Sequence, residues 1–478
     1  MTGPVVIGVD LGTSAVKIVA VDDDGRVVAS ARAEYPTRRP EAEAAEQDPR
    51  RWWEALGAAG DIVAGLAAPQ RWHAIGLTAM LPTLVELDGA LEPVGAAITW
   101  EDGRAERHAD VLRAKVGDAA LYRITGQRVD GRYLGPMHAR LQELGRVGTT
   151  VAGAKDVLFH QLTGTLLTDP STAAGSAAFD IEYGCWSDEL VTASGLPRLP
   201  QVASAATALP LRQRWRERWG VPGELPVVLG AADSVLGARG VGALDHGDVG
   251  VIAGTSAVVL GISDQPTRDP AMRYLVTPLA GTGWGLEMDL LAMGSAFDGV
   301  ASLFGLAGPA ELLEAAATVA HADAPLFLPY LSPGEQGALW DPSLTGSLQG
   351  LRLGMGIGHI GRALLTGIVV ELRRCIDVLT ATTGRSGPVR LGGGSAVSPL
   401  MWQDIADATG REVWVDPTVT DHSAMGAALF AADAIGRPIS REGAPRVVTP
   451  RAERHAWWTD CLARHDQARV GSGGRMNR

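Results

Sequence analysis

The sequence has few cysteines and no run of basic residues, and these absences exclude several classes of protein. Its three cysteines, Cys185, Cys375 and Cys461, lie far apart and match neither a disulfide framework nor a metal-ligand spacing, so a reducing compartment is expected. The histidines form no His-x-His or His-x-x-x-His pair, which argues against a metal site built on histidine. With a net charge of −12 and no basic block, the chain is not expected to bind nucleic acid.

Long hydrophobic runs are absent as well. No uninterrupted apolar stretch reaches the length of a membrane span, and the start of the chain lacks the basic and apolar regions of a signal peptide. We therefore expect a cytoplasmic protein with no membrane partner. Hydrophobic residues make up 46% of the chain, a globular composition, and 478 residues exceed what one compact core holds, so two or three domains are expected.

What the sequence does contain is a long-range repeat. The pentapeptide Gly-Thr-Ser-Ala-Val occurs at Gly12–Val16 and again at Gly254–Val258, inside segments that agree at about half of their positions. Each segment predicts a β-hairpin, because an apolar strand is followed by a turn of glycine and small hydroxyl residues and then by a second strand. Glycine lets backbone N–H groups approach an anion, and threonine and serine add donors. Two such turns predict a site that grips a polyphosphate from both sides.

The two copies differ where a nucleotide site would need them to differ. The first carries Asp10 and Lys17, and the second has Ile252 and Val259 at the corresponding positions. A carboxylate and an ammonium on one side only predict a magnesium–nucleotide site with a defined direction, in which Asp10 holds Mg²⁺ through water. A hairpin with an ordinary aspartate-initiated turn remains the alternative.

The pattern around each copy predicts an α/β fold. In the first half, three antiparallel strands, a helix introduced by Asp48 and Pro49, and a further strand are typical of a ribonuclease-H-like domain. In the second half, a long helix is predicted from His359 to Thr383, since its apolar residues recur mostly four apart. The predicted strands and helices cover residues 5–11, 16–22, 25–36, 52–67, 72–79, 83–89, 96–100, 224–233, 388–394, 398–410, 411–416 and 423–436.

Three further motifs have side chains suited to chemistry. Asp233 ends a predicted strand at the carboxyl edge of a sheet, where it can accept the proton of an attacking hydroxyl, although an N-cap is the alternative. The turn Gly392–Gly394 permits close approach of a ligand to the backbone, but an ordinary tight turn is equally compatible. The segment Trp100–Arg104 combines an aromatic ring, carboxylates and a guanidinium, which suits a polyol or, alternatively, an ion-paired helix start.

With these motifs in order, the chain resembles the FGGY family of carbohydrate kinases, and within it the xylulokinases most. The resemblance runs from about Val5 to Gly436. The motifs that carry it are DLGTSAVK (10–17), EQDPRRWWEAL (46–56), WEDGR (100–104), KDVLFHQLTG (155–164), TDPSTAAGSAAFD (168–180), GAADSVLGARGVG (230–242), AGTSAVV (253–259), FLPYLSPGE (327–335), LGGGSAVSPLMWQDIAD (391–407) and SAMGAAL (423–429).

The resemblance implies two actin-like ATPase domains flanking a deep cleft, at residues 1–243 for the sugar and 244–436 for most of the ATP, followed by an extension at 437–478 with a disordered tail at its end. Asp233 matches the family's catalytic base, and Asp10 matches the carboxylate for Mg²⁺ and phosphate. The nucleotide residues would be Asp10, Gly12, Thr13, Ser14, Lys17, Gly254, Thr255, Ser256, Gly393 and Gly394. The substrate residues would be Met80, Leu81, Trp100, Asp102 and Asp233.

The resemblance also implies an activity, transfer of the γ-phosphoryl group of MgATP to a ketopentose or related polyol, and a possible homodimer. Departures from the xylulokinase pattern leave the substrate open. The histidine of Gln-Met-His-Gly is Leu81 here, and the asparagine of Trp-Asn-Asp is Glu101. Gluconate, an alditol or glycerol are alternative substrates. An actin-like ATPase without kinase activity and a non-catalytic sugar-binding regulator are the more distant alternatives.

Overall fold

The computed structural model describes residues 3–332, 337–396, 398–440 and 445–471, which form two compact units. The first unit contains Met1–Gly240, Asp264–Gly285 and Asp421–Gly443, and the second contains Val241–Ser263, Leu286–Thr420 and Ala444–Arg478. The units therefore interleave along the chain, with a late segment returning to the first unit.

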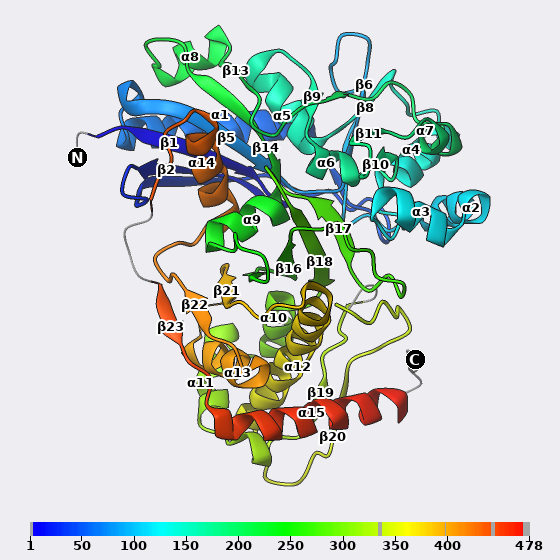
Figure 1. Cartoon of the computed structure of the whole chain (residues 1–478), viewed down its shortest axis with the longest axis vertical. Coiled ribbons are helices and arrows are strands. Elements are labelled where there is room, and N and C mark those ends of the chain that lie inside the picture. Colours follow the sequence, from blue (N-terminus) through cyan, green and yellow to red (C-terminus); the bar gives the residue numbers. More distant parts are fainter. Residues whose placement is uncertain (1–2, 333–336, 397, 441–444, 472–478) are drawn as a thin grey trace. The chain divides into compact units, whose positions relative to one another are not determined.

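A six-stranded sheet of order β13-β14-β5-β1-β2-β3 forms the centre of the first unit (Figure 1). Strands β1, β2 and β3 are antiparallel, whereas β5 and β14 run parallel to β1. This arrangement confirms the predicted ribonuclease-H-like half. The strand bounds are β1 (Val5–Leu11), β2 (Ala15–Asp22), β3 (Val27–Glu34), β5 (Trp72–Ala79), β13 (Ala208–Pro210) and β14 (Pro226–Ala232).

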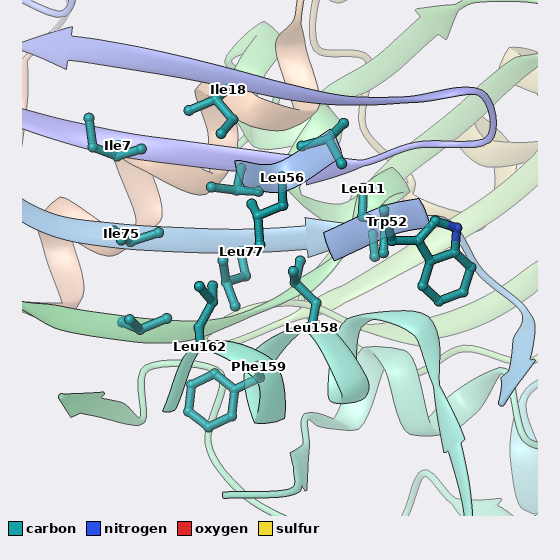
Figure 2. Packing of buried hydrophobic residues seen from close by; sticks show 14 of the residues in the cluster. Ile7, Leu11, Ile18, Trp52, Leu56, Ile75, Leu77, Leu158, Phe159 and Leu162 are labelled. Atoms are coloured by element: carbon teal, nitrogen blue, oxygen red, sulfur yellow. The ribbon is translucent and has the colours of Figure 1, made fainter. Parts of the chain in front are cut away.

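One face of this sheet carries the main apolar core. Alternate residues of a strand point to opposite faces, and the set that includes Ile7 and Leu11 packs against helices α1 (Pro49–Leu66) and α5 (Ala154–Thr163). Asp48 caps α1 as predicted, since its side chain accepts from the Arg50 N–H. Figure 2 shows labelled members of this core from all of these elements, Ile7, Leu11, Ile18, Ile75, Leu77, Trp52, Leu56, Leu158, Phe159 and Leu162.

Helix α14 (His422–Ala434) packs on β1 and β5 through the other set of residues. The contact is backbone to backbone, because a Cβ on Gly8 would lie 1.8 Å from the Ala424 carbonyl oxygen and one on Gly76 would lie 2.0 Å from that of Ala427. Helix α9 (Asp233–Val241) approaches α14 as closely, at Gly426 and Gly240. Any side chain at these glycines would push α14 away from the sheet.

The remainder of the first unit surrounds a second sheet of order β4-β7-β6-β8, with its own apolar cluster. Its strands are β4 (Glu46–Gln47), β6 (Thr83–Leu87), β7 (Ala97–Thr99) and β8 (Thr150–Gly153). The helices are α2 (Glu106–Val116), α3 (Asp118–Thr125), α4 (Leu134–Glu143), α6 (Pro170–Ala174), α7 (Asp188–Ser194) and α8 (Gln213–Trp219). Short strands are β9 (Leu167–Thr168), β10 (Phe179–Asp180), β11 (Cys185–Trp186), β12 (Gln201–Val202) and β17 (Leu275–Pro278).

The second unit repeats the strand order of the first. Its strands follow the order β18-β16-β15-β21-β22-β23, with β15 antiparallel to β16 and parallel to β21. This matches β3-β2-β1-β5-β14-β13, so the sequence repeat is also a repeat of topology. The bounds are β15 (Val249–Ala253), β16 (Ala257–Ser263), β18 (Trp284–Leu290), β21 (Val389–Gly392), β22 (Val413–Val415) and β23 (Arg446–Val448), with a separate pair β19 (Leu326–Leu328) and β20 (Ser347–Gln349).

The helices of the second unit are α10 (Gly294–Leu303), α11 (Pro309–Ala317), α12 (Ile357–Thr383), α13 (Pro399–Thr409) and α15 (Ala452–Gly471). Helix α12 confirms the long helix predicted at 359–383. Helix α15 was not predicted; it occupies 20 residues of the extension, and Arg374 of α12 pairs with its Asp466 at 2.9 Å. The predicted disordered tail was GSGGRMNR (471–478); its first residue, Gly471, ends α15, and the rest lies outside the described residues. None of the helices in the described ranges has the length and hydropathy needed to span a bilayer.

We predict that Gly76→Ala lowers the stability of the first unit. The new Cβ would collide with the backbone of α14, and overpacking of this kind costs about 1–3 kcal/mol. Thermal unfolding should show a lower Tm for Gly76→Ala. The control is Gly65→Ala in α1, where a Cβ meets nothing within 4 Å. An unchanged Tm for Gly76→Ala would contradict the tight contact between α14 and the sheet.

Candidate active site

The loop of the first hairpin, Gly12–Ser14, is held by side chains from several other elements. The Trp100 indole N–H donates to the Thr13 hydroxyl at 3.0 Å, and the Gln47 amide donates to the Thr13 carbonyl at 2.7 Å. The Tyr35 hydroxyl donates to the Gly12 carbonyl. Trp100, predicted to face a polyol, thus contacts the predicted phosphate loop directly. Gln47 and Tyr35 were not among the predicted site residues.

Asp10 and Lys17 are cross-strand partners close to the loop of this hairpin, and a second carboxylate lies near them. The Lys17 Nζ lies 3.6 Å from Asp10 Oδ2 and 3.4 Å from Asp421 Oδ1. Asp10 shares the sheet face of Gly8, on which α14 packs, and Asp421 directly precedes α14. Nothing in the sequence pattern connects Asp421 with Lys17, so this residue was missed.

Burial shapes the electrostatics of the group. Asp10 is 4% exposed, its Oδ1 has no hydrogen-bond partner, and burial raises its pKa although Lys17 opposes the shift. Burial by itself would lower the pKa of Lys17, but the two carboxylates outweigh it and raise that pKa.

A buried carboxylate oxygen without a donor fits a cation. Mg²⁺ keeps several waters and binds through one or two carboxylates together with phosphate oxygens, so Asp10 suffices as a protein ligand. Within the described ranges no three histidine, cysteine or acidic side chains gather in a metal-binding group.

Asp233 lies at the same sheet edge as Asp10. Asp10 pairs with Thr78 of β5, and Thr78 pairs with Ala231 of β14, two residues before Asp233. Adjacent strands are about 4.8 Å apart, so β1, which carries Asp10, and β14, which ends just before Asp233, lie about 10 Å apart across the sheet. Figure 1 shows β1, β5 and β14 side by side. The carboxyl ends of these parallel strands form the candidate active site of the first unit.

Asp233 is the first residue of α9. Its Oδ1 accepts from the N–H of Ser234 at 2.9 Å, and its carbonyl accepts from the Ser423 hydroxyl of α14 at 3.2 Å. Both the base and the cap interpretations therefore remain predictions for this side chain, whose backbone is held in place by α14.

A buried polar network holds the end of β14 directly before Asp233. The Asp169 carboxylate accepts from the Lys155 ammonium at 2.9 Å and from the Ser171 backbone N–H at 2.9 Å. Lys155 donates to the Leu229 carbonyl, and the Ser171 hydroxyl accepts from the Ala232 N–H at 2.9 Å.

Lys155 and Asp169 are each 1% exposed, so breaking this network would leave a buried charge without its partner. Both lie in motifs quoted for the resemblance, but no role was predicted for them. Lys155 is one of only three lysines in the sequence, and this rarity could have indicated that it has a role.

The remaining predicted substrate residues of this unit have different surroundings. Met80 is buried, and its N–H donates to the Leu11 carbonyl at 2.9 Å, so Leu81 follows directly after the sheet edge. The Asp102 carboxylate is 1% exposed, accepts from the Ala45 N–H at 2.9 Å and pairs with Arg104 at 2.6 Å. The structure thus has the ion pair that was the alternative reading of this segment, and direct contact of Asp102 with a substrate stays a prediction.

The second unit brings together its two predicted nucleotide motifs. Parallel pairing of Ile252 with Gly392 places Gly254–Ser256 beside the turn of Gly393 and Gly394. The Gly254 carbonyl accepts from the Ser395 hydroxyl at 3.0 Å and from the Gly294 N–H of α10 at 3.1 Å. Gly393 has φ +100°, and a Cβ there would lie 2.2 Å from the Ala253 carbonyl oxygen, so this turn requires glycine.

The two hairpins close differently despite their common pentapeptide. In the first, Leu11 pairs with Val16 around the four residues 12–15, and in the second Ala253 pairs with Ala257 around the three residues 254–256. The Gly12 N–H donates to the Ala15 carbonyl, whereas the Gly254 N–H donates to the Ser256 carbonyl. The same five residues therefore present their donors in two different geometries.

Comparison with known proteins identifies the family. The model of the FGGY family of carbohydrate kinases, N-terminal domain, matches residues 5–240, and that of the C-terminal domain matches residues 249–435. The chain belongs to the FGGY family of carbohydrate kinases.

Among relatives of this FGGY kinase, the xylulose kinase of Escherichia coli (strain K12) is 31% identical over 435 residues, which are 89% of each chain. The gluconokinase of Bacillus subtilis (strain 168) is 26% identical over 457 residues, 90% of this chain and 88% of the relative. The crystal structure of xylulose kinase from Rhodospirillum rubrum superposes with a TM-score of 0.85 at 26% identity and covers 98% of both chains. These findings establish an ATP-dependent sugar kinase with the two-domain, actin-like fold that the sequence predicted.

We predict that Ser171→Ala lowers kcat more than it changes KM for ATP. The substitution removes the acceptor of the buried Ala232 N–H, and such a loss costs about 1–3 kcal/mol, which loosens the backbone before Asp233. Ser171→Thr, which restores a hydroxyl, should recover part of kcat. Coupled ADP-release kinetics measure both constants.

The control is Ser176→Ala, since Ser176 is also buried but donates to Ala173 instead of contacting β14. An equal fall of kcat in the two alanine variants would contradict a specific role for Ser171.

Proposed function

We propose that this FGGY kinase transfers the γ-phosphoryl group of MgATP to a hydroxyl of a ketopentose such as xylulose, or of a related polyol, with Asp233 as general base. The supporting observation is the register of β1, β5 and β14, which puts Asp10 and Asp233 two strands apart at one sheet edge. Phosphoryl transfer needs one carboxylate for the nucleotide's metal ion and one for the acceptor hydroxyl.

The nucleotide end of the proposed reaction depends on the two loops and on Lys17. Backbone N–H groups and the hydroxyls of Thr13, Ser14, Thr255 and Ser256 would donate to phosphate oxygens, and Lys17 would bind as a point charge. Mg²⁺, bound through water by Asp10, would neutralise charge on the transferring group. A cation beside Asp10 also favours its ionised form, which offsets the effect of burial on its pKa.

The acceptor end depends on Asp233. The substrate hydroxyl oxygen attacks the γ-phosphorus, its proton passes to the Asp233 carboxylate, and the bond to the β,γ-bridging oxygen breaks to release ADP. Lys155, Asp169 and Ser171 act through the backbone of β14 and are positioning residues. Most of the rate enhancement in this type of reaction comes from positioning and from preorganised charge.

The substrate is proposed to be xylulose-like because the E. coli relative at 31% identity is a xylulose kinase. Gluconate is the second candidate, since the B. subtilis relative is a gluconokinase. Leu81 bears on this choice. Its isobutyl side chain makes no hydrogen bond, whereas the xylulokinase pattern has histidine there, and sites that pair substrate hydroxyls discriminate strongly between substrates.

We predict that Asp233→Asn lowers kcat by about 10²–10⁴-fold, because the amide cannot accept the hydroxyl proton. Calorimetric titration should show an affinity for ADP within a few-fold of the unmodified enzyme. Asp118→Asn, which changes an exposed aspartate of the same unit, should leave both values unaltered. Full turnover by Asp233→Asn would remove this residue from the mechanism.

We further predict that Leu81→His raises kcat/KM for D-xylulose relative to gluconate by about tenfold, since an imidazole adds a hydrogen-bonding partner for a sugar hydroxyl. Leu81→Met, which keeps an apolar side chain of similar volume, should leave the ratio unchanged. Steady-state kinetics with both substrates test the difference. The same ratio in all three proteins would show that position 81 does not select the substrate.

A further inference from the structure

The second unit contains a cavity of about 600 Å³ that belongs to none of the predicted nucleotide motifs. Its walls come from the segment before β19, the first turns of α12 and α13, and the start of α15. A volume in this range is typical of sites for small organic ligands. The lining residues are Ala320, His321, Ala322, Arg362, Pro399, Leu400, Gln403, Asp404, Arg451, Arg454 and Trp457.

Two of the three arginines in the wall are paired with buried carboxylates. Arg362 contacts Asp404 at 2.9 Å, and Asp404 is 1% exposed. Arg451 donates to Asp407, also 1% exposed, at 2.5 and 2.9 Å. Each pair is neutral as a unit, so neither attracts an anion strongly.

Arg454 is different. No ion pair links its guanidinium to a carboxylate within the described ranges. It donates instead to His321 Nδ1 at 3.1 Å and lies 5.4 Å from the centre of the Trp457 ring. Its Nε is buried and makes no hydrogen bond. The wall therefore carries one positive charge in excess, in a protein whose net charge is −12.

His321 holds Arg454 in this position. Because Nδ1 accepts from Arg454, the proton of a neutral imidazole is on Nε2, and from there it donates to Asp404 Oδ1 at 3.1 Å. The imidazole also packs edge-on against Trp457 and Trp458. The guanidinium is thus fixed before any ligand arrives, and a preorganised cation loses less entropy on binding an anion.

The first turn of α13 adds a second attraction for anions. Pro399 and Leu400 line the cavity and begin an eleven-residue helix, whose N-terminal end carries partial positive charge. Trp457 offers an apolar ring beside the charged groups. Helix α15 begins at Ala452, beyond residue 435, where the match to the family model ends.

From these observations we propose that the cavity binds a small phosphate monoester, with the phosphate on Arg454 and the start of α13 and the organic part against Trp457. A phosphate dianion matches a guanidinium fork and a helix N-terminus together. The volume of the cavity leaves room for a small organic group besides the phosphate. Binding would join α15 to α13 and so stabilise the second unit against unfolding.

The test is calorimetric titration of the enzyme saturated with MgADP, so that the nucleotide loops are occupied, at constant ionic strength. The probe is phenyl phosphate, with phenol as the uncharged control. Phenyl phosphate is expected to bind at millimolar concentration and to raise the Tm, and phenol is not. Arg454→Gln should weaken binding by about tenfold or more, equivalent to 1.4 kcal/mol.

Arg464→Gln is the matched control, because Arg464 lies 5.7 Å from the same Trp457 ring but does not line the cavity. It should keep the affinity within about twofold, a difference well under 1.4 kcal/mol. Ala322→Glu is a second variant that places a carboxylate at an exposed position of the wall without removing any contact, and it should also abolish binding. No binding to the unmodified enzyme, or an affinity in Arg454→Gln or Ala322→Glu equal to that of the unmodified enzyme, would overturn the proposal.

Discussion

The close packing of α14 against β1, β5 and α9 is the constraint on which the candidate site depends. Gly8, Gly76 and Gly240 let the backbone of this helix approach the sheet and α9 more closely than any side chain would allow. Because of that approach, Asp421 at the start of α14 reaches Lys17, and Ser423 reaches the backbone of Asp233. One late helix thus organises carboxylates from both ends of the sequence.

Buried charge is the second theme of the first unit. Lys155 and Asp169 are removed from water, and each charge is acceptable only because the other and several hydrogen-bonding groups accompany it. Their arrangement gives rigid support to the strand end before Asp233. Asp10 is buried with an oxygen that lacks a donor, a local cost that a bound cation would relieve. The buried charges of Lys155 and Asp169, which support the strand end, have hydrogen-bond partners. The Oδ1 atom of Asp10, which is proposed to bind a cation, has none.

The two units have the same topology because the sequence contains an internal repeat. The two copies of the repeat differ in sequence, and this difference would give the bound nucleotide a defined orientation. Both units have the same strand order and the same pentapeptide, yet the first hairpin closes around four residues and the second around three. Only the first hairpin has a carboxylate, Asp10, and an ammonium, Lys17, on residues close to its loop. Membership of the FGGY kinases accounts for both units, while α15, which contributes one wall of the cavity, begins beyond the last residue matched by the family models.

The sequence by itself determined both hairpins, the order of most strands and helices, and the family, since local periodicity, turn residues and a repeated motif all lie within short stretches of chain. It also indicated Asp10 and Asp233, because each ends an apolar strand. Only the tertiary structure decided that Asp421 contacts Lys17, that Ser171 holds β14, that Asp102 is ion-paired with Arg104, and that α15 completes a cationic cavity. Those contacts join residues far apart in sequence, and their energies depend on burial, which no local pattern encodes.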